Sequence, residues 1–253
     1  MNVIDIFPVS KSLDSSLKKN TAFIKRLRTA ITAATLNTFL QEIRTLSLNK
    51  YLSEIISACY EGLCRLKSPG EIEAGVEIVS ALHQRFGPSD FTEYLGWLVG
   101  KGLATPEKSL LKSLAADLRE KEEKERLTRQ RVLLRVVTEL WLVGVLRTLD
   151  DASRPDDASR GKESLSGMTK LSEAKIKGGS SMKGGGNEPF PLEVLKDLLG
   201  HDRDHANLPL LVIFVKAFGW DILGVRKAGA EGRKTVQEDG ATDTHGDTMD
   251  EDD

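Results

Sequence analysis

Hydrophobic residues recur at steps of three and four positions along the first part of the chain, which is the period of amphipathic helices. The run from Ser68 to Glu71 predicts a helix start. The serine can cap the helix, Pro69 suits its first turn, and Glu71 can bond back to the cap. Asn49 is expected to cap the start of the third helix, at residues 49–63. The predicted helices cover residues 17–31, 36–46, 49–63, 69–86 and 91–98.

A long segment after Pro106 contains neither proline nor glycine until Gly144. Its middle, residues 119–131, is almost entirely charged and has no wide apolar face to bury. We therefore expect either a solvent-exposed helix or a joint between two helices there. Residues 132–149 are strongly apolar and predict a central core helix, and two further helices are expected at 190–200 and 207–223.

Changes in composition divide the chain into ordered and disordered parts. Residues 150–188 are rich in Gly, Ser and Lys, and such a segment cannot bury enough apolar surface to offset its ordering entropy. The expected parts are a flexible N-terminus (1–16), the first part of a helical-repeat domain (17–149), a disordered insert (150–188), the continuation of the domain (189–225) and a disordered acidic tail (226–253).

The spacing of the helices also predicts their arrangement. Helix starts near residues 17, 49 and 89 recur at the interval of stacked helix pairs, and strand signals are nearly absent. The predicted fold class is therefore all-α, with HEAT-like antiparallel helix pairs.

The overall composition narrows the class of protein. The 253 residues include 40% hydrophobic residues, enough for a sizeable core, and 36 Lys and Arg against 38 Asp and Glu. The resulting net charge of −2 argues against a basic nucleic-acid binder on charge alone. The sequence has no apolar run of membrane-spanning length, no secretory signal and two cysteines, so we expect a cytoplasmic protein with no membrane contact.

Candidate chemistry is sparse. His201 and His205 are four positions apart, but Gly200 has just ended a helix, so a polar turn is favoured over a metal site. Cys59 and Cys64 are not expected to pair or to act as nucleophiles, and the Gly-rich residues 178–186 are interpreted as a linker. We expect no enzyme activity, cofactor, metal or small-molecule substrate. The segment His83-Gln84-Arg85 is assigned a structural role near the end of the fourth helix, where a cation complements the helix dipole. Trp97, Trp141 and Trp220 are assigned to the core.

Charge is unevenly distributed along the chain. Residues 11–30 contain six bases and one acid, whereas residues 238–253 contain eight acids and no Lys or Arg. The basic residues of the first helix surround its apolar stripe, and a solvated helix face is the simplest interpretation. A contact for RNA phosphates or for an acidic partner is the alternative. The candidate contact residues are Lys18, Lys19, Lys25, Arg26 and Arg28.

The segment LKKNTAFIKRLR at residues 17–28 resembles the opening of the first middle domain of the up-frameshift suppressor two family of nonsense-mediated mRNA decay, in wording closest to a fungal form. LSLNKYL at 46–52, LHQRF at 82–86 and the block 201–224 fit the same family. The resemblance covers residues 17–224. It implies a HEAT-like crescent, similar to the middle domain of the translation initiation scaffold four-G, that contributes structure and protein contacts rather than catalytic residues.

Two functional hypotheses follow from the resemblance and the charge pattern. The first is a non-enzymatic scaffold module of nonsense-mediated mRNA decay whose partners are proteins of the mRNA surveillance machinery. The second is direct RNA binding by the basic first helix. A complete middle domain should continue after Gly224, so we also expect a shortened domain. Its last helix, with Phe214, Phe218 and Trp220, would lack a neighbour and favour association.

Overall fold

The computed structural model describes residues 7–104, 115–152, 188–200, 202, 205 and 207–224. These residues form helices and no β-strand, apart from an isolated bridge between Asp14 and Leu46. The predicted all-α fold class is therefore confirmed. The α-helices are α1 (Leu17–Thr29), α2 (Ala33–Thr45), α3 (Leu52–Leu63), α4 (Pro69–Gly87), α5 (Glu93–Leu103), α7 (Ala116–Leu142), α8 (Phe190–Gly200) and α9 (Leu208–Leu223).

Short turns join some of the helices. The 3-10 turn η1 (Asn49–Tyr51) precedes α3, the π-helical turn η2 (Pro88–Thr92) links α4 to α5, and the 3-10 turn η3 (Leu149–Asp151) follows α7. Asn49 lies inside η1 and forms no cap, so the prediction that it begins the third helix is wrong. That helix begins three residues later because the extra turn occupies the expected cap position.

The predicted start of α4 is confirmed in detail. The Ser68 hydroxyl accepts a bond from the backbone N–H of Glu71, and the Glu71 carboxylate accepts bonds from the backbone N–H groups of Ser68 and Lys67. These bonds lower the pKa of Glu71, with the Lys67 N–H as the largest cause. The helix ends at Gly87, whose positive φ of 79° suits glycine.

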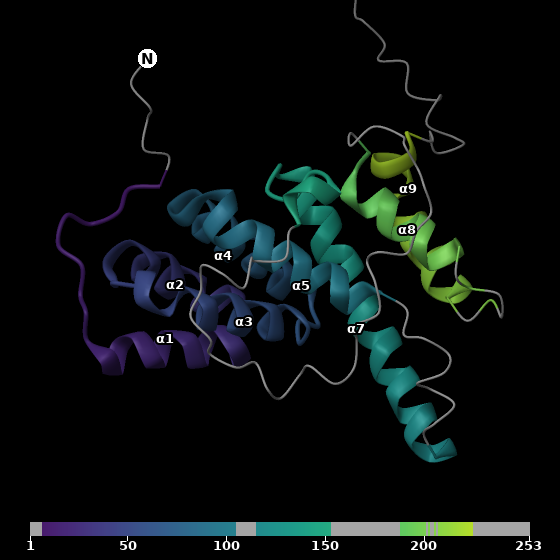
Figure 1. Ribbon diagram of the computed structural model, residues 1–253, viewed down its shortest axis with the longest axis horizontal. Coiled ribbons are helices and arrows are strands. Elements are labelled where there is room, and N and C mark those ends of the chain that lie inside the picture. Colours follow the sequence, from purple (N-terminus) through teal and green to yellow (C-terminus); the bar gives the residue numbers. More distant parts are fainter. Residues whose placement is uncertain are drawn as a thin grey trace, which may run out of the picture.

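The helices stack as antiparallel pairs in two layers. Helix α1 packs against α3 and α3 against α5 on one side, while α2 packs against α4 and α4 against α7 on the other. Figure 1 shows α1 and α2 at one end of the molecule and α8 and α9 at the opposite end. A continuous hydrophobic core runs between the layers from Phe23 to Phe214.

Close approach of α1 and α3 depends on a glycine. A Cβ atom on Gly62 would lie 2.1 Å from the carbonyl oxygen of Leu27, far inside van der Waals contact. The backbones of the first and third helices can therefore touch only because position 62 has no side chain.

Helix α7 resolves the two alternatives for the charged segment, because residues 116–142 form one continuous helix. Its first part is mostly exposed and extends away from the body of the molecule, as Figure 1 shows. Its second part is buried around Leu133, Val136 and Val137. The helix ends at Leu142 rather than near 149, because Gly144 adopts a positive φ of 76° that turns the chain back into the core.

The N-terminal segment contacts the end of α2 where it is described. The backbone N–H of Ser10 donates to the carbonyl of Arg44 at 2.9 Å, and the N–H of Asp14 donates to that of Thr45 at 2.8 Å. Phe7 lies under the Arg44 guanidinium, 4.9 Å from ring centroid to Cζ. Residues 7–16 therefore run along the end of α2. The expected disordered tail lies outside the described residues, as does the insert except at 150–152 and 188.

A buried polar cluster joins the last two helices to the rest of the domain. Arg126 on α7 is 3% exposed, and its Nη1 donates to Gln130 Oε1 at 2.8 Å and to Asn207 Oδ1 at 3.0 Å. Gln130 in turn donates to the carbonyl of Leu103 at 2.7 Å, and Asn207 donates to that of Leu198 at 3.1 Å. The cluster thus connects the end of α5, the middle of α7 and the junction between α8 and α9.

Apart from Lys216 and Asp221, helix α9 consists of apolar residues on all its sides. Leu210, Phe214 and Ile222 are buried against the domain, but Trp220 is 43% exposed. The assignment of Trp220 to the core is therefore wrong, while Trp97 and Trp141 are half-buried against it. In the described part of the chain, no helix combines the length and apolar character needed to cross a membrane.

Candidate functional site

Helix α1 carries the predicted contact residues, and its inner face determines how they are presented. Asn20, Phe23 and Leu27 are buried along this face, and the Phe23 ring meets the Phe39 ring edge-on at 5.7 Å. The Ser16 hydroxyl caps the helix by accepting a bond from the N–H of Lys19. With these positions turned inward, the basic side chains must lie on the flanks and the outer face.

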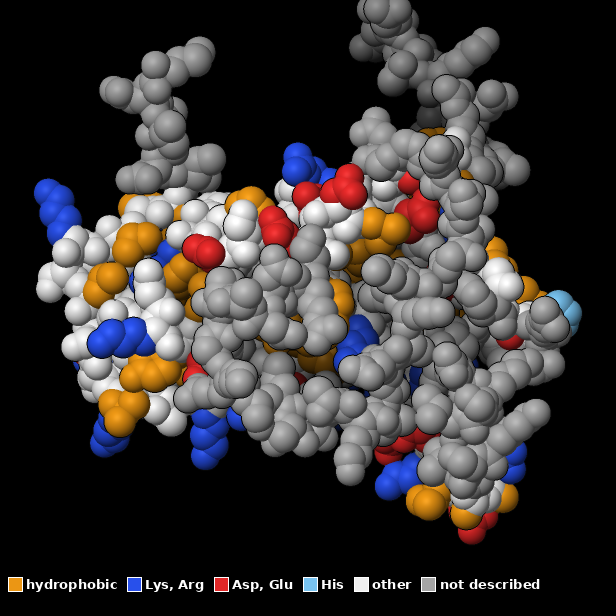
Figure 2. Space-filling view, viewed as in Figure 1, with side chains coloured by type: hydrophobic (Ala, Val, Ile, Leu, Met, Phe, Trp, Pro, Cys, Tyr) orange, Lys and Arg blue, Asp and Glu red, His pale blue; other side chains and the backbone are white. Residues whose placement is uncertain are grey.

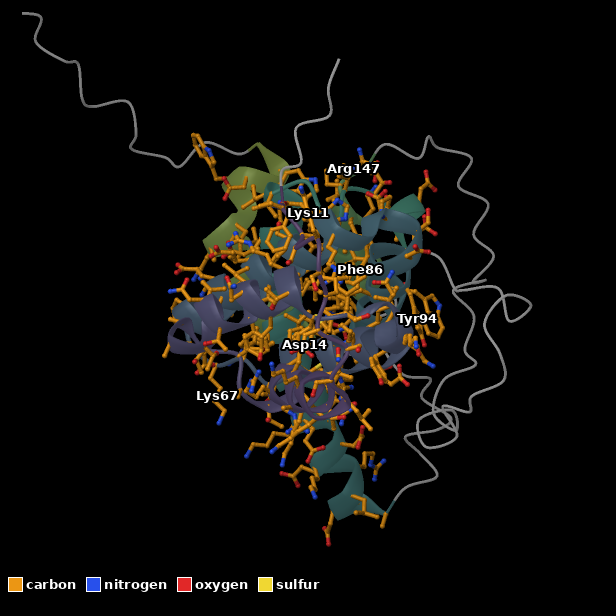
Figure 3. The ribbon with its side chains drawn as sticks, turned by 90° about the vertical axis from the view of Figure 1, so that its left-hand side faces the viewer. Lys11, Asp14, Lys67, Phe86, Tyr94 and Arg147 are labelled. Atoms are coloured by element: carbon orange, nitrogen blue, oxygen red, sulfur yellow. The ribbon has the colours of Figure 1, made fainter. Side chains whose placement is uncertain are left out.

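Lys19 forms an ion pair with Asp14, which lies just before α1. Its Nζ lies 2.6 Å from Asp14 Oδ2, and the Asp14 backbone is held against α2. The shared hydrogen bond raises the pKa of Lys19 and lowers the pKa of Asp14. Figure 3 shows Asp14 and Lys11 on this end of the molecule. The Lys19 charge is therefore partly neutralised before any ligand arrives.

Arg26 and Arg28 pair with acids on neighbouring helices. Arg26 Nη2 donates to both carboxylate oxygens of Glu42 on α2. Arg28 Nε lies 2.9 Å from Glu61 Oε2 on α3, a charge contact in which the N–H does not align as a hydrogen bond. These two arginines hold α1 to its neighbours, so their first role is structural.

Lys18 and Lys25 are the two predicted residues that remain exposed and form no ion pair with the described residues. Seven positions separate them, so they lie on the same side of α1, about 10 Å apart along its axis. Figure 2 shows the Lys and Arg side chains at this end as separate groups rather than one continuous patch on the face in view. The structure therefore brings two of the five candidates together as a free cationic pair.

The other candidate residues have structural roles. His83 Nδ1 lies 2.6 Å from Thr92 Oγ1, and burial lowers the pKa of His83. Arg85 is the basic residue in the last turn of α4, and its guanidinium donates to the backbone carbonyls of Ile43 and Leu46. Burial raises the pKa of Cys59 to about 12 and that of Cys64 to about 11, which disfavours the thiolate.

The predicted polar turn between α8 and α9 is described only at Asp202 and His205. Asp202 Oδ2 accepts a bond from the Asn207 N–H at 2.7 Å. Within the described residues, no group of three or more His, Cys, Asp or Glu side chains is placed to hold a metal ion.

Sequence reasoning missed two features. The first is the buried polar cluster, in which Arg126 bonds to Asn207. These two residues are 81 positions apart in the sequence, and no local pattern marks such a contact. The exposed side of α9 had a visible signal, because residues 208–223 contain Lys216 and Asp221 as their sole charged residues. A helix of that composition has more apolar surface than one contact with the domain can cover.

Comparisons with known proteins agree with the all-α fold and with the family resemblance of residues 17–28. The chain is 41% identical over 150 residues to "Nonsense-mediated mRNA decay protein 2" of Saccharomyces cerevisiae, and 38% identical over 154 residues to the protein of that name from Schizosaccharomyces pombe. Each match covers 58% of this chain but 13% and 15% of the relatives, so the chain spans a small part of their length. No protein-family model matches.

A solved structure extends the agreement to most of the chain. The N-terminal mIF4G domain of Saccharomyces cerevisiae Upf2, a protein involved in the degradation of mRNAs containing premature stop codons, superimposes with a TM-score of 0.64 at 32% identity. The match covers 85% of this chain and 61% of the solved chain.

Proposed function

The chain is homologous to the N-terminal MIF4G domain of Upf2, and from this premise we propose that it acts in nonsense-mediated mRNA decay as a non-enzymatic scaffold module. The homology is the observation that carries the proposal. The partners are proteins of the mRNA surveillance machinery, and the site of action is the cytoplasm. A stack of helix pairs suits this role, because it offers long surfaces for other proteins.

The charge arrangement on α1 favours protein contact over RNA as the main activity. Lys19, Arg26 and Arg28 are already paired with Asp14, Glu42 and Glu61, so binding a phosphate would require breaking or sharing those contacts. Lys and Arg side chains that bind phosphates displace counterions condensed on the RNA, and a side chain already in an ion pair must in addition give up that pair.

A pull-down from cell extract tests the scaffold proposal. The full chain is used as bait, with and without RNase treatment. Decay or translation factors that remain bound after RNase are the expected result. Loss of every partner on RNase treatment would contradict the proposal and make RNA the primary ligand.

RNA binding by α1 is the second candidate function, supported by the exposed pair Lys18 and Lys25. Contacts to phosphates make affinity fall with salt concentration, with a log–log slope of about −0.7 for each phosphate of a single strand. If these two lysines are the contacts, the slope should be about −1.4, whereas engagement of all five candidates should give about −3.5.

Charge reversal locates the contact. The double variant Lys18→Glu/Lys25→Glu should weaken binding to a single-stranded RNA, measured by fluorescence anisotropy. The matched control is Lys121→Glu/Lys124→Glu, which makes the same change in net charge at two exposed positions on α7. Equal effects of the two variants would indicate a general charge effect and remove α1 as an RNA site.

A further inference from the structure

The outer side of α9 is a large apolar surface at the end of the helix stack. Six of its large apolar side chains are between 40% and 52% exposed, and Leu199 at the end of α8 is 58% exposed. The α9 residues are Leu208, Val212, Ile213, Val215, Trp220 and Leu223.

A helix that is hydrophobic all round is normally buried on all sides. Leu210, Leu211 and Phe214 account for the inner side of α9. The outer side carries comparable apolar residues, and among the described elements α9 packs mainly against α7 and α8. Contiguous exposed surfaces of this kind mark protein interaction sites.

The two charged residues of α9 indicate what covers this surface. Lys216 and Asp221 are both exposed, and neither forms an ion pair with the described part of the chain. By helical periodicity they flank a strip made of Ile213, Ala217 and Trp220, all exposed. The spacing of this strip, four residues and then three, matches the seam of a two-stranded coiled coil.

Five positions separate Lys216 from Asp221. In a parallel pair of helices, a residue on one flank of the seam faces the residue five positions further on along the opposite flank of its partner, the g-to-e contact. Lys216 would therefore meet Asp221 of the partner subunit. Two-fold symmetry would form the same ion pair a second time.

We propose that a second copy of this chain binds the outer side of α9, through parallel pairing of the two α9 helices. The seam consists of Ile213, Ala217 and Trp220, and the reciprocal Lys216–Asp221 pairs fix its direction and register. The area that the seam can bury, on the order of a few hundred Å² on each copy, lies at the low end of specific interfaces, so the dimer is a weak one. This inference goes beyond the proposed function and does not rest on it.

Sedimentation equilibrium of the full chain over a concentration series tests the pairing. The wild-type chain should approach twice its mass of 27.8 kDa. Lys216→Glu and Asp221→Lys should each weaken dimerisation about tenfold, because each places like charges at both symmetric contacts. Ile213→Glu should leave a monomer, and Lys124→Glu on α7 is the charge-matched control that should dimerise normally.

Mixing the two single variants gives the decisive result. An equimolar mixture of Lys216→Glu and Asp221→Lys should form a heterodimer, since the glutamate introduced in one chain then faces the lysine introduced in the other. The double variant should dimerise with itself for the same reason. Circular dichroism confirms that each variant is folded. A wild-type chain that stays monomeric, or a mixture that fails to associate, would overturn the proposal and favour an unrelated helix as the covering partner.

Discussion

The two ends of the helix stack differ in the polarity of their outer surfaces. At the end formed by α1 and α2, the apolar side chains apart from Leu17 mostly turn inward, the outer side of α1 carries basic residues, and residues 7–16 run along the end of α2. At the end formed by α8 and α9, the outer side of α9 carries six large apolar side chains that are 40% or more exposed. Terminal repeats of a solenoid need a polar outer face to be soluble, and in this chain the first end has one.

The difference shows that similar helix pairs can be held in place by different forces. Phe23 and Phe39 lock the first pair by apolar packing, with ion pairs around the rim. The last pair depends in addition on the buried cluster of Arg126 and Asn207. The first end is therefore expected to behave as part of the global fold, and the last pair as a unit that can open separately.

The largest expected effect comes from removing the ring at the centre of the first pair. Phe23→Ala should lower the free energy of unfolding by about 3–5 kcal/mol, because Phe23 is fully buried and its removal leaves a cavity. Val212→Ala on the exposed side of α9 is the control and should change stability by less than about 0.5 kcal/mol. Urea denaturation followed by circular dichroism measures both, and equal losses would erase the distinction between the ends.

The close contact of α1 and α3 gives the next effect. Gly62→Ala should destabilise the chain by about 1–3 kcal/mol, because the new Cβ atom would collide with a backbone oxygen that cannot rotate away. Gly70→Ala is the matched control, since open space surrounds that position and alanine favours the helix. Thermal melts should show a lower Tm for the first variant and an equal or higher Tm for the second.

A local effect should follow from breaking the polar cluster. Asn207→Ala removes an acceptor of buried Arg126 and the bond to the Leu198 carbonyl, at a cost of about 1–3 kcal/mol. Amide hydrogen exchange should show faster exchange in α8 and α9, with α1–α4 unchanged. Uniform acceleration over the whole chain would mean that the last pair unfolds with the rest.

The smallest expected effect is the pH dependence at His83. Burial lowers its pKa, so the unfolded chain binds a proton more readily than the folded one, and stability should decline as the pH falls below about 6.5. His83→Gln removes this titration while leaving a polar side chain. A pH series of urea midpoints from about 7.5 to about 5 should therefore be flatter for the variant, and parallel curves would contradict the assignment.

Local sequence signals determined the helices and the fold class. The cap at Ser68 and Glu71 and the stop at Gly87 were predictable, because these contacts lie within a few residues of each other. The resemblance of residues 17–28 to one family was also legible in the sequence alone, and the homology to the Upf2 domain agrees with it. The first helix and its basic composition needed no tertiary information.

The tertiary structure alone decided which charges are free and which apolar side chains remain exposed. Glu42 and Glu61 neutralise Arg26 and Arg28 from other helices, so the sequence of α1 could not distinguish these arginines from Lys18 and Lys25. Trp220 fits a helical core pattern, yet it is exposed because the neighbours of α9 cover a single side of it. Helix formation depends on nearby residues, whereas pairing and burial depend on segments that meet only after folding.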